Sequence, residues 1–165
     1  MQLTQHSDYA MRVLVYLGTK GERGDESATI QEIADAYGIS KNHLMKVVNH
    51  LARHGYVASR RGRGGGIRLG RAPHEIGVGE VIRATEEDMA LVECLRPDGG
   101  GLCRIDGACR LRGMLREALR AFLAVLDGYT LADILGPHGA LARRLALPPR
   151  AATAAAAGPS PPPPP

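Results

Sequence analysis

Apolar residues recur at intervals of three and four positions along the N-terminal third of the chain, a spacing that predicts amphipathic helices. Three such helices are expected, over residues 4–18, 30–37 and 41–54. Gly18 and Gly21 are expected to end the first helix, because glycine is unfavourable in helix interiors. Thr29 and Glu32 form a Thr-x-x-Glu capping box at the start of the second.

The segment that joins the second and third helices has the features of a helix-turn-helix. Gly38 can adopt the left-handed conformation of a tight turn, and Ser40 is a favourable N-cap for the third helix. The outer face of the third helix carries basic and amide side chains but no acid, which suits a DNA groove. Two short strands, expected over residues 56–59 and 67–69, flank a basic glycine-rich tip and predict a wing.

The C-terminal half predicts further helices around an irregular segment. They are expected over residues 79–87, 110–126 and 130–135. The longest carries an apolar stripe of Leu111, Met114, Leu115, Ala118, Leu119, Phe122, Leu123 and Leu126. Because this stripe lies beyond a complete DNA-binding unit, we expect it to form a dimer interface. The predicted fold class is mainly α, a winged helix-turn-helix domain with a long C-terminal dimerisation helix and a cysteine-containing cluster loop.

Composition divides the 165 residues into three parts. Residues 1–76 are expected to be the winged helix-turn-helix domain, and residues 77–147 the cluster loop and dimerisation helices. Residues 148–165 hold eight of the eleven prolines and an alanine tract, and are expected to be a disordered tail.

Positive charge is concentrated in one segment. Residues 39–71 contain eight Lys and Arg and no Asp or Glu, whereas the whole chain has a formal net charge of only +4. Such a field favours a polyanionic partner, and its coincidence with the helix-turn-helix indicates double-stranded DNA. The expected DNA-binding residues, at the start of the third helix and on the wing, are Ser40, Lys41, Asn42, His43, Lys46, Arg60, Arg61 and Arg63.

Several function classes lack support in the sequence. It contains no run of eighteen apolar residues and no signal-peptide pattern at the N-terminus, so a cytoplasmic protein without membrane association is expected. The His-Glu-x-x-His and Gly-x-Ser-x-Gly motifs of hydrolases are absent, and no cysteine has a plausible histidine partner in the same segment. The chain is therefore not expected to be an enzyme.

Three cysteines share the irregular segment before the longest helix, with the spacing Cys94-x8-Cys103-x5-Cys109. Their odd number argues against a disulfide framework, and the spacing lacks the paired C-x2-C units of common zinc sites. The small residues between them allow a loop to wrap a bulky inorganic core, which favours an iron–sulfur cluster. Cys109 directly precedes a helix, whose positive end favours a thiolate. The fourth ligand is open between water, a small molecule, a histidine and a carboxylate, and the nearest carboxylates in sequence are Glu93, Asp98 and Asp106.

Several short patterns occur together along residues 1–135. They are Leu3-Thr4-x-x-Ser7-Asp8-Tyr9-Ala10-x-Arg12-Val13-Leu14, the Ile33-Ala34 to Gly38-Ile39-Ser40 turn, Asn42-His43-Leu44-x-Lys46-Val47-Val48, Gly55-Tyr56-Val57, the Arg63-Gly64-Gly65-Gly66-Ile67-x-Leu69 wing and the three cysteines. Through them the chain resembles the NsrR nitric-oxide-sensing repressors, a branch of the winged-helix iron–sulfur regulators that also includes IscR.

The resemblance implies a homodimer that binds a palindromic operator and releases it when nitric oxide attacks a cluster held by Cys94, Cys103 and Cys109. It also raises Asp8, in its own or the partner chain, above the other carboxylates as fourth ligand, with Arg12 supporting the Asp8 carboxylate.

Two positions depart from the patterns of these regulators. Arg112 stands where an IscR-like histidine ligand is expected, which favours the NsrR branch and its carboxylate ligand. The gap of eight residues after Cys94 is longer than usual for the family, so the cluster type is open. A [4Fe–4S] cluster is expected, with [2Fe–2S] as the alternative.

Two other interpretations use the same residues. A regulator that senses cluster supply or redox state would share every motif and differ only in what destroys the cluster. A zinc-stabilised DNA-binding module would hold zinc with the three cysteines and a carboxylate. Such a module would be colourless and insensitive to nitric oxide.

Overall fold

The computed structural model of the chain describes residues 2–22, 27–60, 65–96, 103–136 and 140–147. Its elements, with η for a 3-10 helix, are α1 (Gln5–Gly21), α2 (Ile30–Tyr37), α3 (Lys41–Arg53), β1 (Val57–Arg60), β2 (Gly66–Leu69), η1 (Pro73–Glu75), α4 (Val78–Thr85), η2 (Glu93–Leu95), α5 (Arg110–Asp127), α6 (Leu131–Leu135) and α7 (Ala140–Arg144). The predicted tail, together with Arg61, Arg63 and Asp98, lies outside the described residues.

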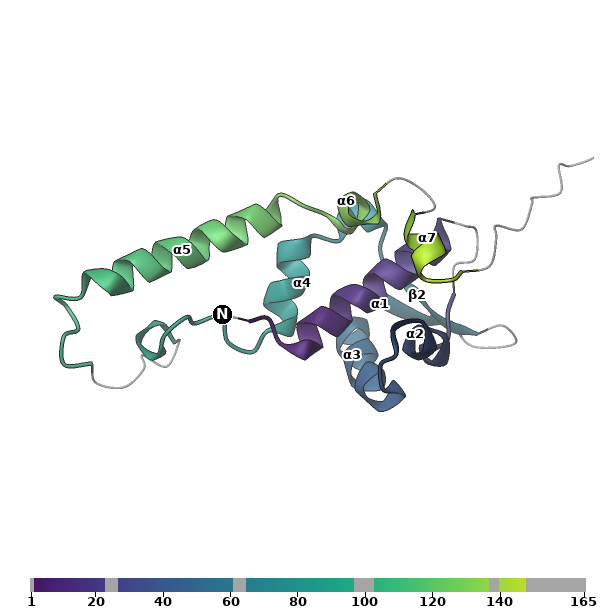
Figure 1. Cartoon of the computed structure of the whole chain (residues 1–165), viewed down its shortest axis with the longest axis horizontal. Helices are drawn as coiled ribbons and strands as arrows, with labels where there is room; N and C mark the ends of the chain where they lie inside the picture. Colours follow the sequence, from purple (N-terminus) through teal and green to yellow (C-terminus); the bar gives the residue numbers. More distant parts are fainter. Residues whose placement is uncertain (1, 23–26, 61–64, 97–102, 137–139, 148–165) are drawn as a thin grey trace, which may run out of the picture.

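α1 runs through the middle of the DNA-binding part and is packed against α3, α4, α6 and β2 (Figure 1). The side chains of its inner face are almost completely buried and are Ala10, Val13, Leu14 and Leu17. The prediction that Gly18 helps to end this helix is wrong, because α1 continues to Gly21. A Cβ at position 18 would lie 2.8 Å from a methyl carbon of Leu135 in α6, so close packing explains this glycine.

α2 and α3 form the predicted helix-turn-helix. Gly38 caps α2 with φ 63° and ψ 33°, the left-handed conformation expected at the turn. Ser40 occupies the N-cap position of α3 as predicted, although its side chain makes no capping hydrogen bond. Only the Ser40 carbonyl joins the helix, accepting from the backbone N–H of Leu44 at 3.1 Å. The Ser40 residue stays exposed at the start of α3.

The wing is a two-stranded antiparallel sheet in which Val57 pairs with Leu69. β1 begins one residue later, and β2 one residue earlier, than predicted. Ala28, just before α2, extends the sheet by a bridge to Ile67, with N–H···O distances of 2.9 and 2.8 Å. Gly66 permits this approach, since a Cβ there would lie 2.5 Å from the Ala28 carbonyl oxygen. The wing is therefore fixed to the segment that enters the helix-turn-helix.

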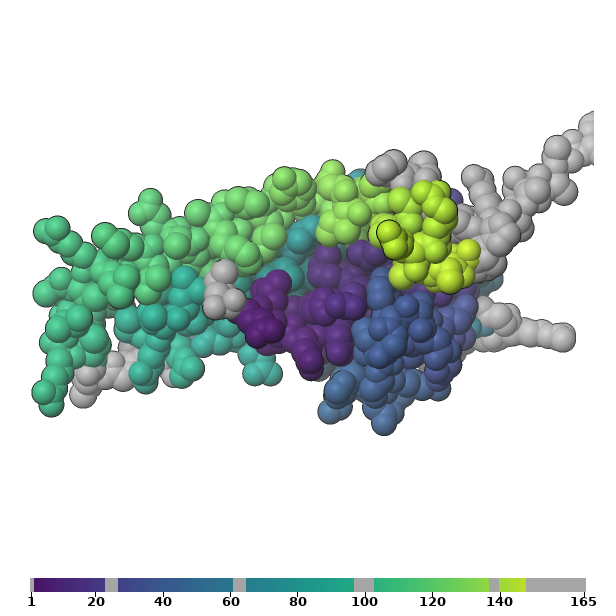
Figure 2. Space-filling view, viewed as in Figure 1, coloured from purple at the N-terminus to yellow at the C-terminus, as the bar shows by residue number. Residues whose placement is uncertain are grey.

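α5 extends away from the helix-turn-helix as a long helix (Figure 1), and its surface is continuous with that of the neighbouring segments in Figure 2. Its main contacts are with α4 and η2, and an ion pair between Arg83 of α4 and Asp127 anchors its C-terminal end. Not one residue of α5 is buried. Leu111, Met114 and Val125 are 58, 62 and 61% exposed, respectively. Within the predicted apolar stripe, Leu111, Met114 and Ala118 are therefore exposed in a single chain, whereas its other members, Leu115, Leu119, Phe122, Leu123 and Leu126, are half-buried.

Two short helices complete the core. α6 contributes the buried side chains Leu131 and Leu135, and the backbone N–H of Leu131 donates to the Ile76 carbonyl at 2.8 Å. α7, which the sequence pattern did not predict, packs against α1 (Figure 2). Its residue Ala142 is only 2% exposed. One core therefore joins the helix-turn-helix to helices on both sides of the cysteine segment.

Candidate DNA-binding surface and cysteine loop

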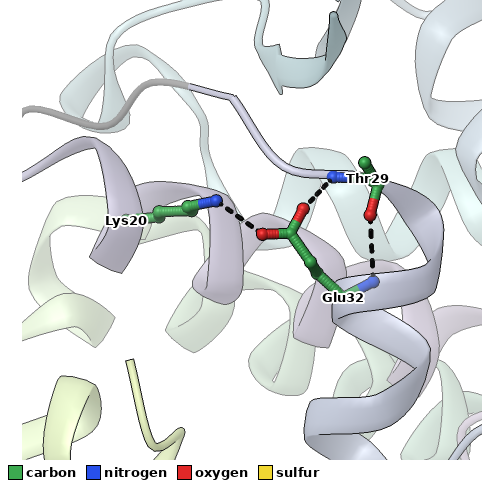
Figure 3. A network of polar contacts seen from close by, with 3 residues as sticks. All are labelled: Lys20, Thr29 and Glu32. Carbon is green, nitrogen blue, oxygen red and sulfur yellow. Dashed lines mark hydrogen bonds and ion pairs between the residues drawn. The ribbon is translucent and has the colours of Figure 1, made fainter. Parts of the chain in front are cut away.

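A polar network fixes the start of the helix-turn-helix to α1 (Figure 3). The Thr29 hydroxyl accepts from the Glu32 backbone N–H at 3.1 Å, and the Thr29 backbone N–H donates to the Glu32 carboxylate at 2.5 Å. Lys20 of α1, whose side chain is only 9% exposed, donates from Nζ to the same carboxylate at 2.9 Å. Burial alone would raise the pKa of Glu32, but the Thr29 and Lys20 hydrogen bonds outweigh it and lower the pKa. The capping box predicted from sequence is thus confirmed, and Lys20 adds an unpredicted partner.

Replacing Glu32 with Gln is expected to lower the free energy of unfolding by about 1 kcal/mol at pH 7, because the charged cap and its Lys20 partner are lost. A depressed pKa stabilises the fold above the unfolded value of about 4.3 and loses this contribution as pH falls through the folded value. The difference between wild type and Glu32→Gln should therefore shrink below pH 4.3, as measured by urea unfolding at several pH values. Glu87→Gln, an exposed acid after α4, is the control. An equal loss in the control would contradict the assignment.

The residues expected to contact DNA lie at the start of α3 and at the end of β1. Those within the described residues are Ser40, Lys41, Asn42, His43, Lys46 and Arg60, and all six are exposed. A cleft of about 190 Å³ between α1 and α3 brings His43 and Lys46 beside Gln5, His6 and Tyr9. α3 has no acid in its first turn, so the field at its outer face is positive.

A histidine of α3 makes a contact with α1. His50 is half-buried, with its Nδ1 2.9 Å from Nε2 of His6 on α1 and its ring 4.7 Å from that of His54. Burial, followed by the charges of His54 and His6, lowers the pKa of His50. His50 thus holds α3 against α1. No periodic pattern could indicate this contact, because 44 positions separate the two rings in sequence.

The three cysteines are free thiols in the structure. Cys94 lies in η2, Cys103 is exposed, and Cys109 is the N-cap of α5. Between the last two, the backbone N–H of Asp106 donates to the Cys103 carbonyl at 3.0 Å, and Gly107 turns the chain with φ 85°. Within the described ranges, no three His, Cys, Asp or Glu side chains are grouped closely enough to hold a metal ion.

Arg112, in the first turn of α5, links this helix to the segment that carries the cysteines, residues 94–109, here called the cysteine loop. Its Nη1 donates to a carboxylate oxygen of Asp106 at 2.5 Å. Its Nε is buried and has no hydrogen-bond partner among the described residues. An unpaired buried donor is costly unless a further acceptor completes it. The three thiols and this N–H donor belong to adjacent parts of the chain, and thiolates and N–H donors are the groups that suit an anionic sulfur-rich cofactor.

Asp8 is held in place on α1. Arg12, one turn further, donates from Nε to both carboxylate oxygens at 3.0 Å, and its Nη2 lies 2.8 Å from Oδ2. The hydrogen bond that Arg12 donates to Asp8 is the main cause of a raised Arg12 pKa. The carboxylate remains 47% exposed and is accessible to a second chain. Figure 1 places the start of α5, which carries Cys109, at the end of the molecule remote from the wing.

Comparison with known proteins assigns this fold to a family. The model of the family Rrf2, described as "Iron-dependent Transcriptional regulator", matches residues 3–137. The chain is 52% identical over 135 residues to the HTH-type transcriptional regulator NsrR of Bacillus subtilis, covering 82% of this chain and 90% of the relative. The chain is an NsrR-type member of the Rrf2 family. It is also 50% identical to NsrR of Geobacillus kaustophilus, over 86% of this chain and 94% of the relative.

Solved structures support the same assignment for this NsrR-type regulator. A putative transcriptional regulator of Listeria innocua has a TM-score of 0.68 at 28% identity, covering 82% of this chain and 86% of that one. CymR, the global cysteine regulator of B. subtilis, has a TM-score of 0.66 at 25% identity, covering 82% and 96%. The predicted winged helix-turn-helix fold class is therefore confirmed.

The broad functional predictions are confirmed as well. The relatives are named transcriptional regulators and not enzymes, so this NsrR-type chain is a DNA-binding regulator. The helices of the described segments include none that combines the length and apolar character needed to cross a membrane.

Proposed function

We propose that this chain is a homodimeric repressor that binds a palindromic operator and senses nitric oxide through an iron–sulfur cluster. The observation that carries the proposal is that one segment of the chain holds the free thiols of Cys94, Cys103 and Cys109 and is followed directly by Arg112, whose buried Nε–H is unpaired among the described residues. The NsrR relatives and the iron-dependent description of the family support it. Asp8 is the proposed fourth ligand, and [4Fe–4S] the proposed cluster type, with [2Fe–2S] as the alternative.

The proposed dimer follows from α5. Leu111, Met114 and Val125 expose apolar surface on the side of α5 that is not packed against its own chain. A second copy of the same helix offers a matching apolar surface and would also place two α3 helices on one DNA duplex. Two recognition helices related by a two-fold axis read a palindromic site.

Operator binding in this proposal depends on the exposed basic surface of α3 and the wing. Ser40, Lys41, Asn42, His43 and Lys46 would meet bases or phosphates in the major groove, and Arg60, Arg61 and Arg63 would follow the backbone into the minor groove. If the dimer makes about six phosphate contacts, affinity should fall roughly a thousandfold between low and moderate salt. The sensing step therefore has to release DNA that is held by strong electrostatic attraction.

The chain's own contacts provide a route from the cysteine loop to the recognition helix. The Thr85 hydroxyl, at the end of α4, donates to the hydroxyl of Ser7 on α1 at 2.8 Å in a buried position. α1 in turn packs against α3. A bound cluster supplies iron that reacts with nitric oxide. Asp8, next to Ser7, would tie α1 to that site, so release of Asp8 frees α1 and changes the spacing of the two α3 helices.

Titration of the loaded protein with nitric oxide tests this function. An operator duplex would first be selected from a random library with protein prepared without oxygen, and its binding followed by fluorescence anisotropy. Nitric oxide is expected to lower operator affinity about tenfold or more. Asp8→Ala should bind nitric oxide with an altered absorption spectrum and a smaller loss of DNA, whereas Glu117→Ala, an exposed acid of α5, should behave as wild type.

The outcomes separate the interpretations. Retention of DNA in excess nitric oxide contradicts the sensing proposal. Release on oxidation or iron removal, with nitric oxide ineffective, indicates a sensor of redox state or cluster supply. An unchanged spectrum and an unchanged response in Asp8→Ala would remove Asp8 from the ligand set.

A further inference from the structure

Arg112 makes contacts that are unusual for a surface arginine. Its side chain is 33% exposed, yet its Nε is completely buried. Its terminal Nη1 donates to the Asp106 carboxylate at 2.5 Å, whereas the Nε has no acceptor within the described part of the chain. Among the described residues, one other buried side-chain nitrogen or oxygen lacks a partner, the Nε of Arg71, which is far from the cysteines in sequence.

The position of Asp106 gives the ion pair a structural consequence. Asp106 lies midway between Cys103 and Cys109, and its backbone N–H donates to the Cys103 carbonyl. Cys109 begins α5, the helix that carries Arg112. The Arg112–Asp106 pair therefore closes a loop over residues 106–112 that contains the Cys109 thiol, and the Asp106 backbone hydrogen bond connects this loop to Cys103.

The local charge agrees with this arrangement. Arg104, Arg110 and Arg112 lie within three positions of Cys103 or Cys109 in the sequence, where Asp106 is the single acid. Three thiolates make a cofactor site strongly negative, so nearby guanidinium groups stabilise it. Hydrogen bonds from N–H groups to sulfur are a recognised means of adjusting cluster stability and potential.

We propose that Arg112 is a positioning residue for the sulfur ligands. Its ion pair with Asp106 holds the Cys103–Cys109 turn, and its buried Nε–H donates to a sulfur atom of the bound group. The second part rests on the proposed iron–sulfur function. The first part concerns the protein without cofactor and stands independently of it.

Hydrogen exchange on cofactor-free protein tests the ion pair. In Arg112→Ala, the amides of Asp106 and Ala108 are expected to exchange roughly threefold faster, the size expected for a partly exposed pair. Asp106→Asn should have the same effect. Arg116→Ala removes the same charge one turn along α5 at an exposed position and should leave the exchange unchanged.

Iron loss to a chelator, measured on loaded protein, tests the Nε–H donor. Arg112→Ala should lose iron about tenfold faster than wild type, as expected when a group that supports a ligand is removed. Arg112→Lys keeps a cation for Asp106 but lacks the planar Nε–H, so it should retain slow amide exchange and still lose iron quickly. The midpoint potential of the loaded protein should shift in both variants and not in Arg116→Ala.

The possible results distinguish a failure of the proposed Arg112 roles from a failure of the proposed cluster. Wild-type iron retention and potential in Arg112→Ala overturn the donor role, and wild-type amide exchange in Arg112→Ala overturns the ion-pair role. A wild-type protein that binds no iron overturns the proposed cluster and the donor role with it, while the amide exchange still decides the role of the ion pair.

Discussion

A Cys109→Ser variant is expected to lose its iron and its response to nitric oxide while keeping the fold. Serine is one of the best N-cap residues, so α5 should form as before from the position that Cys109 occupies. A serine hydroxyl is not ionised at neutral pH and is a poor ligand for iron in place of a thiolate. Iron content should fall at least about tenfold, because a direct ligand matters more than the surrounding residues do.

Two measurements check this variant. Circular dichroism should give the helix content of the wild type, and iron analysis on protein prepared without oxygen should give the loss. Cys94→Ser and Cys103→Ser should behave alike, since the proposal assigns all three thiols the same role. Full iron retention in any one of the three would remove that cysteine from the ligand set.

A Met114→Glu variant is expected to abolish the dimer and weaken operator binding about hundredfold, the effect typical of a central interface residue. Met114 is 62% exposed in the single chain, so the change should leave the stability of the monomer within about 0.5 kcal/mol. A carboxylate in an apolar interface loses its hydration without gaining a partner. A monomer then reads only one half-site and loses the contribution of the second.

Analytical ultracentrifugation and anisotropy with the selected operator measure both effects. Arg116→Gln is the control, because it changes the net charge by the same amount on the opposite side of α5. A Met114→Glu protein that remains dimeric and binds the operator normally would show that the exposed stripe of α5 is not the interface.

Local sequence signals predicted the DNA-binding half of the fold well. The Thr29–Glu32 capping box and the left-handed Gly38 depend on residues within one or two turns of each other, and both occur in the structure. Ser40 shows the limit of such rules: it stands at the N-cap of α3 without capping by its hydroxyl. A favourable residue type gives a preference for the N-cap position, but the local backbone geometry decides whether its side chain makes the capping hydrogen bond.

Contacts between distant segments explain the remaining differences. Gly18 resembles a helix stop in the sequence, but Leu135 packs on it from α6, and only the folded chain brings them together. His50 has an exposed position by periodicity, yet His6 on α1 covers it. α7 is too short for its apolar spacing to be distinctive, and its packing on α1 is a tertiary effect.

Some features of the cysteine loop could likewise be predicted from the sequence, and others depend on contacts in the folded chain. The thiols, their spacing and the helix that follows Cys109 could be read from the sequence, because they depend on residue type and order. The Arg112–Asp106 pair and the buried Nε could not, since they depend on how the loop folds back on α5. The assignment of Asp8 depends on an approach between chains or segments that no sequence spacing defines.

The most direct test of the proposed cluster is an assay of iron and acid-labile sulfide, with an absorption spectrum, on protein purified without oxygen. A brown protein with about four irons and four sulfides per chain, absent in Cys109→Ser, is the expected result. A colourless protein that contains stoichiometric zinc and no sulfide would contradict the cluster, and would leave a zinc-stabilised DNA-binding regulator in its place.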